Sequence, residues 1–155
     1  MRKTVFYLLI CSFIFSATGC IKDEGCQNKT IQTDAGPIAA YAAANGISGT
    51  THSSGVVYEV TIPGGGPTPT PMSTITVRYT GKLLDGTVFD SQTGTPVTFQ
   101  LGGTIQGFQL ALQQVQKGGT IKFLIPSSLA YGCAGTTGIP PNSILFFEVQ
   151  LVDVM

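Results

Sequence analysis

Most of the chain repeats one pattern, in which apolar and polar residues alternate over a short run that glycine or proline then ends. Alternation with a period of two is typical of half-buried β-strands, and Gly and Pro mark the turns between strands. The runs with this pattern are 55–62, 75–80, 87–90, 97–101, 120–126 and 144–153. Between the fourth and fifth runs the spacing becomes helical, with Ile105, Phe108, Leu112 and Val115 on one face. The pattern predicts an α+β fold: a bent antiparallel sheet of five or six strands wrapped on one short helix of about three turns.

Composition excludes several classes of protein. A length of 155 residues favours a single main domain. With 43% hydrophobic residues, the chain has enough apolar surface for a core and is not a disordered, solvated polymer. Eight Lys and Arg balance eight Asp and Glu, and charged residues are only 10% of the chain, so we expect no nucleic-acid partner. The single histidine, His52, lies in a Thr/Ser-rich stretch without ligand-spaced partners, so we expect no metal and no cofactor.

The N-terminus has the order of a secretory signal. A positive start, Met1 to Lys3, precedes an apolar run at 5–15 and then small residues. As a helix that run would span about 16 Å, against the hydrocarbon thickness of about 30 Å. The small-residue run that ends at Cys20 resembles a bacterial lipobox, in which the cysteine is diacylated and becomes the new N-terminus. The alternative is an anchor helix that is never cleaved.

These features divide the chain into four parts. We expect a lipoprotein signal peptide at 1–19, a lipidated tether at 20–33, an accessory helix and linker at 34–50, and the main domain at 51–155. The Ala-rich helix would begin at Asp34 as its cap, with Pro37 in the first turn. Lipidation at Cys20 implies a membrane anchor in a bacterial cell envelope, on the outer membrane at either its periplasmic or its surface-exposed face. Residues 22–24 resemble a surface-export signal of lipoproteins, and a solvated spacer is the equal alternative.

Two cysteines remain once Cys11 leaves with the signal and Cys20 carries lipid. Disulfides persist outside the cytoplasm, so we predict that Cys26 pairs with Cys133. Two free thiols is the alternative.

Six blocks of sequence, in order, resemble the FKBP-type peptidyl-prolyl cis-trans isomerases. The first is V-R-Y-T-G-K-L-L-D-G-T-V-F-D-S at 77–91, and the others lie at 99–102, 105–108, 118–126, 129–132 and 138–151. The resemblance runs from about residue 56 to residue 154 and implies a half-barrel sheet on a short helix. It also implies isomerisation of X–Pro bonds, with proline-containing unfolded or extended polypeptides as substrates and macrolides as inhibitors.

The resemblance carries site residues over position by position. The expected catalytic residues are Phe89, Asp90, Phe108 and Tyr131, and the expected substrate-binding residues are Tyr79, Val97, Phe99, Ile105, Ile139 and Phe147. The Ile105 backbone amide matches the group that meets the ligand. Two positions depart from the family: Phe108 replaces the usual Trp of the pocket floor, and Val97 replaces a common aromatic. These departures weigh more against tight macrolide binding than against proline binding.

Such a set of residues suits bond rotation. An amide resists twisting by about 18–20 kcal/mol, and the twisted form is less polar because conjugation is lost. A dry apolar cradle therefore favours the transition state over the planar substrate. Two alternatives remain open: a non-catalytic module or chaperone that binds proline segments, and a structural lipoprotein without a ligand, in which Phe99 and Phe147 are ordinary core.

Overall fold

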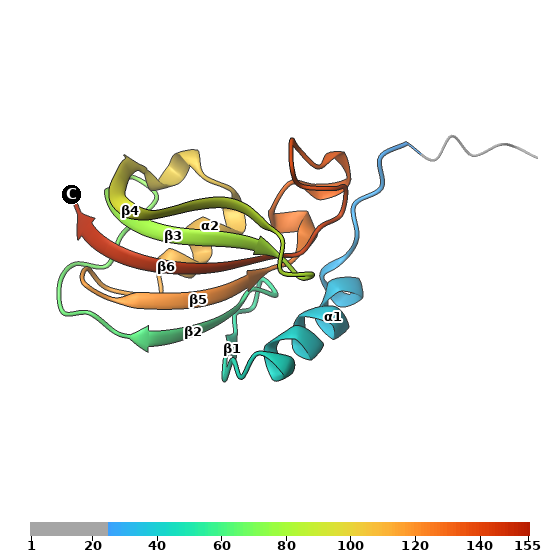
Figure 1. Ribbon diagram of the computed structural model, residues 1–155, viewed down its shortest axis with the longest axis horizontal. Helices are drawn as coiled ribbons and strands as arrows, with labels where there is room; N and C mark the ends of the chain where they lie inside the picture. The colour runs from blue at the N-terminus through green and yellow to red at the C-terminus, as the bar shows by residue number, and fades with distance from the viewer. Residues whose placement is uncertain (1–24) are drawn as a thin grey trace, which may run out of the picture.

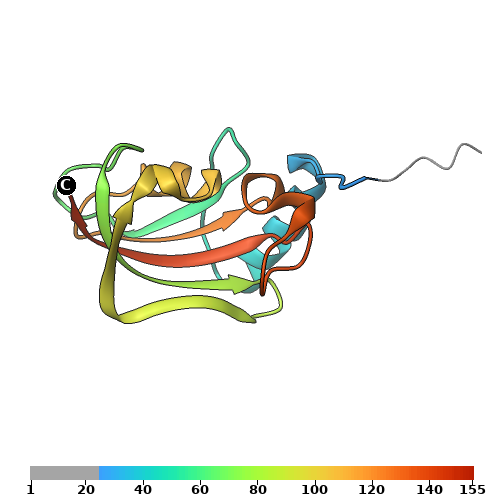
Figure 2. The ribbon, with the colours of Figure 1, turned by 90° about the horizontal axis from the view of Figure 1, so that it is seen from above.

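A computed structural model describes residues 25–155, which form one six-stranded antiparallel sheet with two helices (Figure 1). The strands are β1 Thr50–Thr51, β2 Val57–Ile62, β3 Thr74–Leu83, β4 Val88–Gln100, β5 Thr120–Ile125 and β6 Leu145–Val154. Their order across the sheet is β1-β2-β5-β6-β3-β4. Helix α2, Gln106–Leu112, lies over one face, as the view from above shows (Figure 2). The predicted α+β class is therefore confirmed.

The main core lies between α2 and the sheet. Alternate residues of β5 and β6 point toward α2 and are fully or almost fully buried, among them Phe123, Ile125, Leu145 and Phe147. Gly107 allows α2 to approach this closely, because a Cβ on it would collide with the side chain of Ile125. Helix and sheet thus share one continuous apolar layer.

Two elements differ in extent from the prediction. Residues 88–100 form a single edge strand, β4, where the sequence suggests separate strands at 87–90 and 97–101. An edge strand accepts Pro96 because one side of its ladder needs no partner. Helix α2 has seven residues rather than three turns, because the chain turns after Leu112 while Val115 stays buried. The apolar spacing continues beyond the end of the helix.

Helix α1, Ile31–Ala44, begins three residues before the predicted start. Thr30 is its N-cap, and the Thr30 hydroxyl oxygen accepts the Thr33 amide at 3.2 Å. Asp34 is therefore not the cap, and Pro37 lies inside the helix rather than in its first turn. Within the segment expected as a tether, residues 27–29 hydrogen-bond to the main domain.

Helix α1 covers the face of the sheet opposite α2. Its Ile38 and Ala42 pack on Leu124 of β5 and Phe146 of β6, which form a second apolar cluster. No helix among residues 25–155 is long and apolar enough to cross a bilayer. The expected signal peptide at 1–19 and the lipidation site Cys20 lie outside the described residues.

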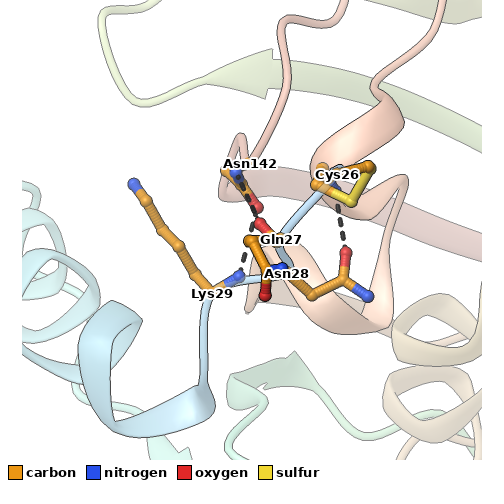
Figure 3. Close-up of a disulfide and its surroundings, with 6 residues drawn as sticks. Cys26, Gln27, Asn28, Lys29 and Asn142 are labelled. Atoms are coloured by element: carbon orange, nitrogen blue, oxygen red, sulfur yellow. Dashed lines mark hydrogen bonds between the residues drawn. A yellow bond between two sulfur atoms is a disulfide. The ribbon is translucent and has the colours of Figure 1, made fainter. Parts of the chain in front are cut away.

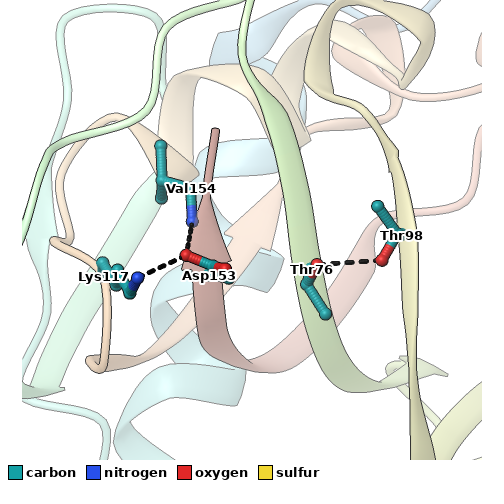
Figure 4. A network of polar contacts seen from close by, with 5 residues as sticks. All are labelled: Thr76, Thr98, Lys117, Asp153 and Val154. Carbon is teal, nitrogen blue, oxygen red and sulfur yellow. Dashed lines mark hydrogen bonds and ion pairs between the residues drawn. The ribbon is translucent and has the colours of Figure 1, made fainter.

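Two polar pairs lie near the C-terminus, at the end of the sheet away from α1 (Figures 1 and 4). Lys117 forms an ion pair with Asp153 at 2.5 Å, and the Thr76 and Thr98 hydroxyls meet at 2.8 Å across β3 and β4. The hydrogen bond from Lys117, together with that from the Val154 amide, lowers the pKa of Asp153.

Candidate active site

A cavity of about 550 Å³ opens between α2 and the strongly curved pair β3–β4, a volume typical of small-ligand sites. It is lined by Tyr79, Phe89, Asp90, Phe99, Gln100, Gly103, Thr104, Ile105, Phe108, Tyr131 and Phe147. Eight of the ten residues predicted for the site therefore share one cavity. They come from β3, β4, α2 with its N-cap, the loop after β5, and β6.

Phenylalanine rings form the floor and one wall. Phe108 meets Phe147 edge to face, with ring centroids 5.3 Å apart and planes at 81°. Phe89 meets Phe147 in the same way at 5.5 Å, and Phe99 lies 6.4 Å from Phe108. Edge-to-face pairs are a favourable arrangement of aromatic quadrupoles and hold rings in fixed orientations. Phe108 and Phe147 are 5% and 6% exposed, so both belong to the core as well as to the cavity.

Gly81 provides the space that these rings occupy. It lies on β3, and a Cβ there would come within 2.6 Å of Phe89 and 2.8 Å of Phe147. No Cβ tolerates such contacts, so the rings reach their places only beside a glycine. The motif Thr80-Gly81-Lys82 thus has a direct role in shaping the cavity.

Tyr79 and Asp90 form a polar pair at the edge of the cavity. The Tyr79 hydroxyl donates to Asp90 Oδ2 at 2.5 Å. Burial first, and then this hydrogen bond, raises the pKa of Tyr79 well above its ordinary value, and the nearby Tyr131 adds to the effect. Tyr79 therefore stays a protonated donor that orients the Asp90 carboxyl group beside Phe89.

Two groups can donate hydrogen bonds to a ligand at the rim. Tyr131 is 40% exposed and contributes its phenol to the lining. Ile105 is the N-cap of α2, and none of the backbone hydrogen bonds within residues 25–155 uses its amide. A ligand with carbonyl groups can thus be met by a backbone amide and by a phenol while its apolar part enters the cavity.

Two residues expected in the site lie elsewhere. Val97 pairs with Val77 across β3 and β4 and packs at the margin of the core. Ile139 is buried, and it borders a different hollow together with Leu83 and Pro140. Neither residue lines the cavity, although the sequence placed both there.

Three polar or small residues of the lining were not predicted. They are Gln100, Gly103 and Thr104, which follow β4 and precede α2. The G-G-T sequence after an alternating strand is the only signal for them. Among residues 25–155 no group of three or more His, Cys, Asp or Glu side chains is placed to hold a metal ion.

A disulfide joins Cys26 to Cys133, with Cα atoms 5.3 Å apart (Figure 3). This is the pairing predicted from the sequence. Cys133 follows Tyr131 by two residues, so the bond attaches the N-terminal segment to the loop that carries the phenol.

The fold and the cavity together define a class of protein: a half-barrel α+β domain with an aromatic pocket for an apolar ring and hydrogen-bond donors at its rim. Residues 65–152 match the family model described as FKBP-type peptidyl-prolyl cis-trans isomerase. The chain therefore belongs to this family, and the resemblance found in the sequence is confirmed.

Individual relatives agree with this assignment. The chain is 48% identical over 106 residues to the FKBP-type peptidyl-prolyl cis-trans isomerase FkpA of Escherichia coli, a match that covers 67% of this chain and 39% of FkpA. It is 43% identical over 104 residues to the outer membrane protein MIP of Legionella longbeachae, covering 65% of this chain and 45% of MIP. The matched segment thus spans less than half the length of these two relatives.

Solved structures share the fold. The crystal structure of Escherichia coli FkpA aligns with a TM-score of 0.69 and 42% identity, covering 80% of this chain and 62% of that chain. A peptidyl-prolyl cis-trans isomerase from Pseudomonas syringae pv. tomato aligns with a TM-score of 0.68 and 30% identity, covering 83% of this chain and 98% of that one.

Proposed function

We propose that the protein is a peptidyl-prolyl cis-trans isomerase that assists the folding of extracytoplasmic proteins. The observation that carries the proposal is the convergence of four phenylalanines, the Tyr79–Asp90 pair, the Tyr131 phenol and the unused Ile105 amide on one cavity. Family membership supports the same activity. The substrates are unfolded or extended polypeptides that contain proline.

The proposed reaction needs no nucleophile, because only rotation about the X–Pro bond takes place. The prolyl ring packs against Phe89, Phe108 and Phe147 in the cavity, and these apolar side chains exclude water from the rotating bond. As the amide twists, its nitrogen and carbonyl lose conjugation, and the less polar twisted form is favoured in this apolar surrounding. Substrate and transition state then differ in binding, as catalysis requires.

The polar groups have separate roles in this proposal. The Ile105 amide and the Tyr131 hydroxyl donate to carbonyls that flank the rotating bond, and so fix one side of the peptide while the other turns. Asp90, held by the Tyr79 hydroxyl, lies where it can act on the polarity of the twisting amide. Phe99 closes the wall beside Phe108.

A protease-coupled assay on a short X–Pro peptide tests the proposal with the full chain purified in mild detergent. The protein should raise the rate of cis-to-trans conversion well above the uncatalysed process, which takes tens to hundreds of seconds. A peptide that binds without faster conversion would support a non-catalytic, chaperone-type module instead. A peptide that neither binds nor converts would leave only a structural role.

The proposed location is a bacterial cell envelope, with a lipid anchor at Cys20 after removal of residues 1–19. The support is the lipobox-like sequence, together with the outer-membrane designation of the relative MIP. In this proposal, residues 51–155 form the isomerase domain and the segment before helix α1 connects it to the membrane. Replacing Cys20 with Ala should release the protein from membranes or leave it unprocessed. Membranes that retain a processed Cys20→Ala variant after washing would contradict lipidation.

Macrolide inhibitors are proposed as ligands of the same cavity. Their apolar portion fits the aromatic floor, and the smaller Phe108 in place of Trp supports weaker binding than in relatives that keep the indole. A titration of the protein with a macrolide, followed by loss of isomerase activity, measures this affinity.

A further inference from the structure

The segment 26–34, here called the strap, runs along the loop that carries Tyr131. This loop, residues 127–142 and here called the Tyr131 loop, connects β5 to the approach of β6 and includes two short 3-10 turns, Ser127–Leu129 and Gly132–Ala134. The strap contacts the loop at three places, Ser127, Cys133 and Asn142. These points lie on both sides of Tyr131 along the chain.

Asp34 holds the start of the loop. Its Oδ2 accepts the Ser127 amide at 2.8 Å and the Ser127 hydroxyl at 2.6 Å, with Asp34 1% and Ser127 0% exposed. The other oxygen, Oδ1, is buried without a hydrogen-bond partner among the described residues. Asp34 thus satisfies both polar groups of the buried Ser127 through one oxygen, while the other oxygen remains unpaired at a cost in free energy. Asp34 therefore holds the first residue of the loop, Ser127, in place four residues before Tyr131.

The other end of the strap holds the loop just beyond Tyr131. The Cys26–Cys133 disulfide joins them covalently, and Asn28 Oδ1 accepts the Cys133 amide at 2.8 Å (Figure 3). Asn142, at the end of the loop, also binds the strap. Its side-chain oxygen accepts the Lys29 amide at 3.2 Å. The Asn142 side-chain amide also donates to the Gln27 carbonyl at 3.2 Å.

The Tyr131 loop has positive φ at Gly132, Gly135, Gly138 and Asn142, with values of 57°, 63°, 79° and 56°. Asn142 adopts this region at some cost, and the three glycines leave the backbone around Tyr131 conformationally permissive. Tyr131 itself is 40% exposed, so core packing does not immobilise its ring. The position of the phenol over the cavity therefore depends on how the backbone on either side of it is held.

We propose that the strap is a positioning element of the active site, in which Asp34 and the Cys26–Cys133 disulfide hold the Tyr131 loop so that the phenol hydroxyl faces the bound peptide. This inference rests on the proposed isomerase function and deepens it. Asp34 does not touch substrate and acts only through Tyr131. The strap lies outside the 65–152 region that the family model matches, so the catalytic domain is completed by residues that precede it.

The test compares three variants of the full chain by exchange NMR of an X–Pro peptide, which needs no auxiliary protease. Tyr131→Phe removes the hydroxyl and should lower kcat/KM about tenfold, the size of one net hydrogen bond at its upper range. Asp34→Ala should lower kcat/KM about three- to tenfold, because a residue that acts only through Tyr131 can lose no more than the tenfold contribution of the Tyr131 hydroxyl. The double variant Cys26→Ser with Cys133→Ser should lower it by a similar factor.

A double-mutant cycle separates positioning from general destabilisation. If the strap acts through Tyr131, then Asp34→Ala in the Tyr131→Phe background should lower kcat/KM by less than about twofold further. Multiplicative losses would overturn the proposal. The matched control is Ala40→Gly, an exposed change in helix α1 that weakens the helix by about 1 kcal/mol without touching the loop, and it should leave kcat/KM unchanged. Asp34→Asn keeps an acceptor oxygen and should recover part of the rate.

A second readout does not depend on activity. With 3-fluorotyrosine incorporated, the ¹⁹F signal assigned to Tyr131 should shift or broaden in Asp34→Ala and in the disulfide variant, while that of Tyr58 on β2, outside the cavity lining, should not. Unchanged Tyr131 signals would overturn the positioning role even in an active enzyme. A wild-type chain that fails to accelerate exchange, but whose Tyr131 signal responds to the strap, would overturn the proposed function and leave the structural linkage established.

Discussion

Phe146 and Phe147 are neighbours on β6, and they point to opposite faces of the sheet. Phe147 meets Phe89, Phe108 and Phe123 on the α2 side. Phe146 packs under α1, with the Tyr41 ring centroid 5.5 Å away. Both are buried, with Phe147 6% and Phe146 8% exposed. Two identical side chains, one residue apart, therefore serve a pocket on one face and an anchoring contact on the other.

The cover on each face accounts for the difference. Helix α1 has 14 residues and places Ile38 and Ala42 over Leu124 and Phe146. Helix α2 has only seven residues, and the cavity opens beside its N-terminal end, at Ile105 and Phe108. An apolar face becomes a binding site where its covering helix is short and polar donors border the gap. Burial alone does not distinguish the two cases.

The strongest test of this comparison replaces each ring in turn. Phe147→Ala and Phe146→Ala should each lower the free energy of unfolding by about 3–5 kcal/mol, because both leave cavities in a packed interior. Only Phe147→Ala should also lower kcat/KM, by about thirtyfold, since a buried phenyl ring contributes about 2 kcal/mol. Urea denaturation and peptide exchange at a temperature where both variants are folded provide the two measurements. An equal loss of activity in Phe146→Ala would show that the faces are not functionally separate.

A smaller effect is expected from closing the cavity without removing a ring. Gly81→Ala places a methyl group against Phe89 and Phe147, and overpacking of this kind costs about 1–3 kcal/mol. We expect the rings to shift and kcat/KM to fall. Gly94→Ala on the paired strand is the control, because no atom lies within 4 Å of its added Cβ. Wild-type activity in Gly81→Ala would mean that the positions of these rings do not govern the rate.

Tyr79 gives a pH-dependent test at the edge of the pocket. Because its folded pKa is raised, Tyr79 contributes stability that is complete below pH 10 and is lost as the pH rises above the ordinary tyrosine range. Tyr79→Phe should remove this alkaline loss, together with the highest-pH step in an ultraviolet titration of tyrosine. A Tyr79→Phe variant that keeps the alkaline loss of stability and the highest-pH titration step would contradict the assigned environment of the Tyr79 phenol.

The smallest effect is expected at the far end of the sheet. Lys117 lowers the pKa of Asp153, so their ion pair stabilises the fold at neutral pH, and this contribution is lost as the pH falls through the lowered value. Asp153→Asn should leave kcat/KM unchanged and lower Tm only slightly, less so at high salt. A marked change in activity would indicate coupling between the two ends of the sheet.

Residues whose environment follows from local pattern were placed correctly by the sequence. The alternating strands around Val77, Phe123 and Val149 indicated the buried face, and the ordered family blocks brought eight site residues to one cavity. Val97 and Ile139 were assigned by position in a motif. Which way a short side chain extends, and which of two adjacent hollows a loop residue borders, depends on tertiary packing that a motif does not encode.

The N-terminal segment was the least predictable part. Asp34 before an Ala-rich run is typical of a helix cap, but Thr30 takes that role and Asp34 turns inward to Ser127. The partners are 93 residues apart, so no local rule distinguishes a capping aspartate from a buried one. The single long β4 is a similar case, because Gly94 and Pro96 interrupt the strand pattern while pairing with β3 holds the strand together.

Exchange NMR of an X–Pro peptide at saturating protein tests the central claim most directly, since it measures rotation in the bound state. The account predicts that bound peptide exchanges between cis and trans much faster than free peptide, and that Phe147→Ala sharply reduces this acceleration while Phe146→Ala preserves it. Bound peptide that exchanges no faster than free peptide would contradict the claim that this aromatic cavity lowers the barrier to rotation.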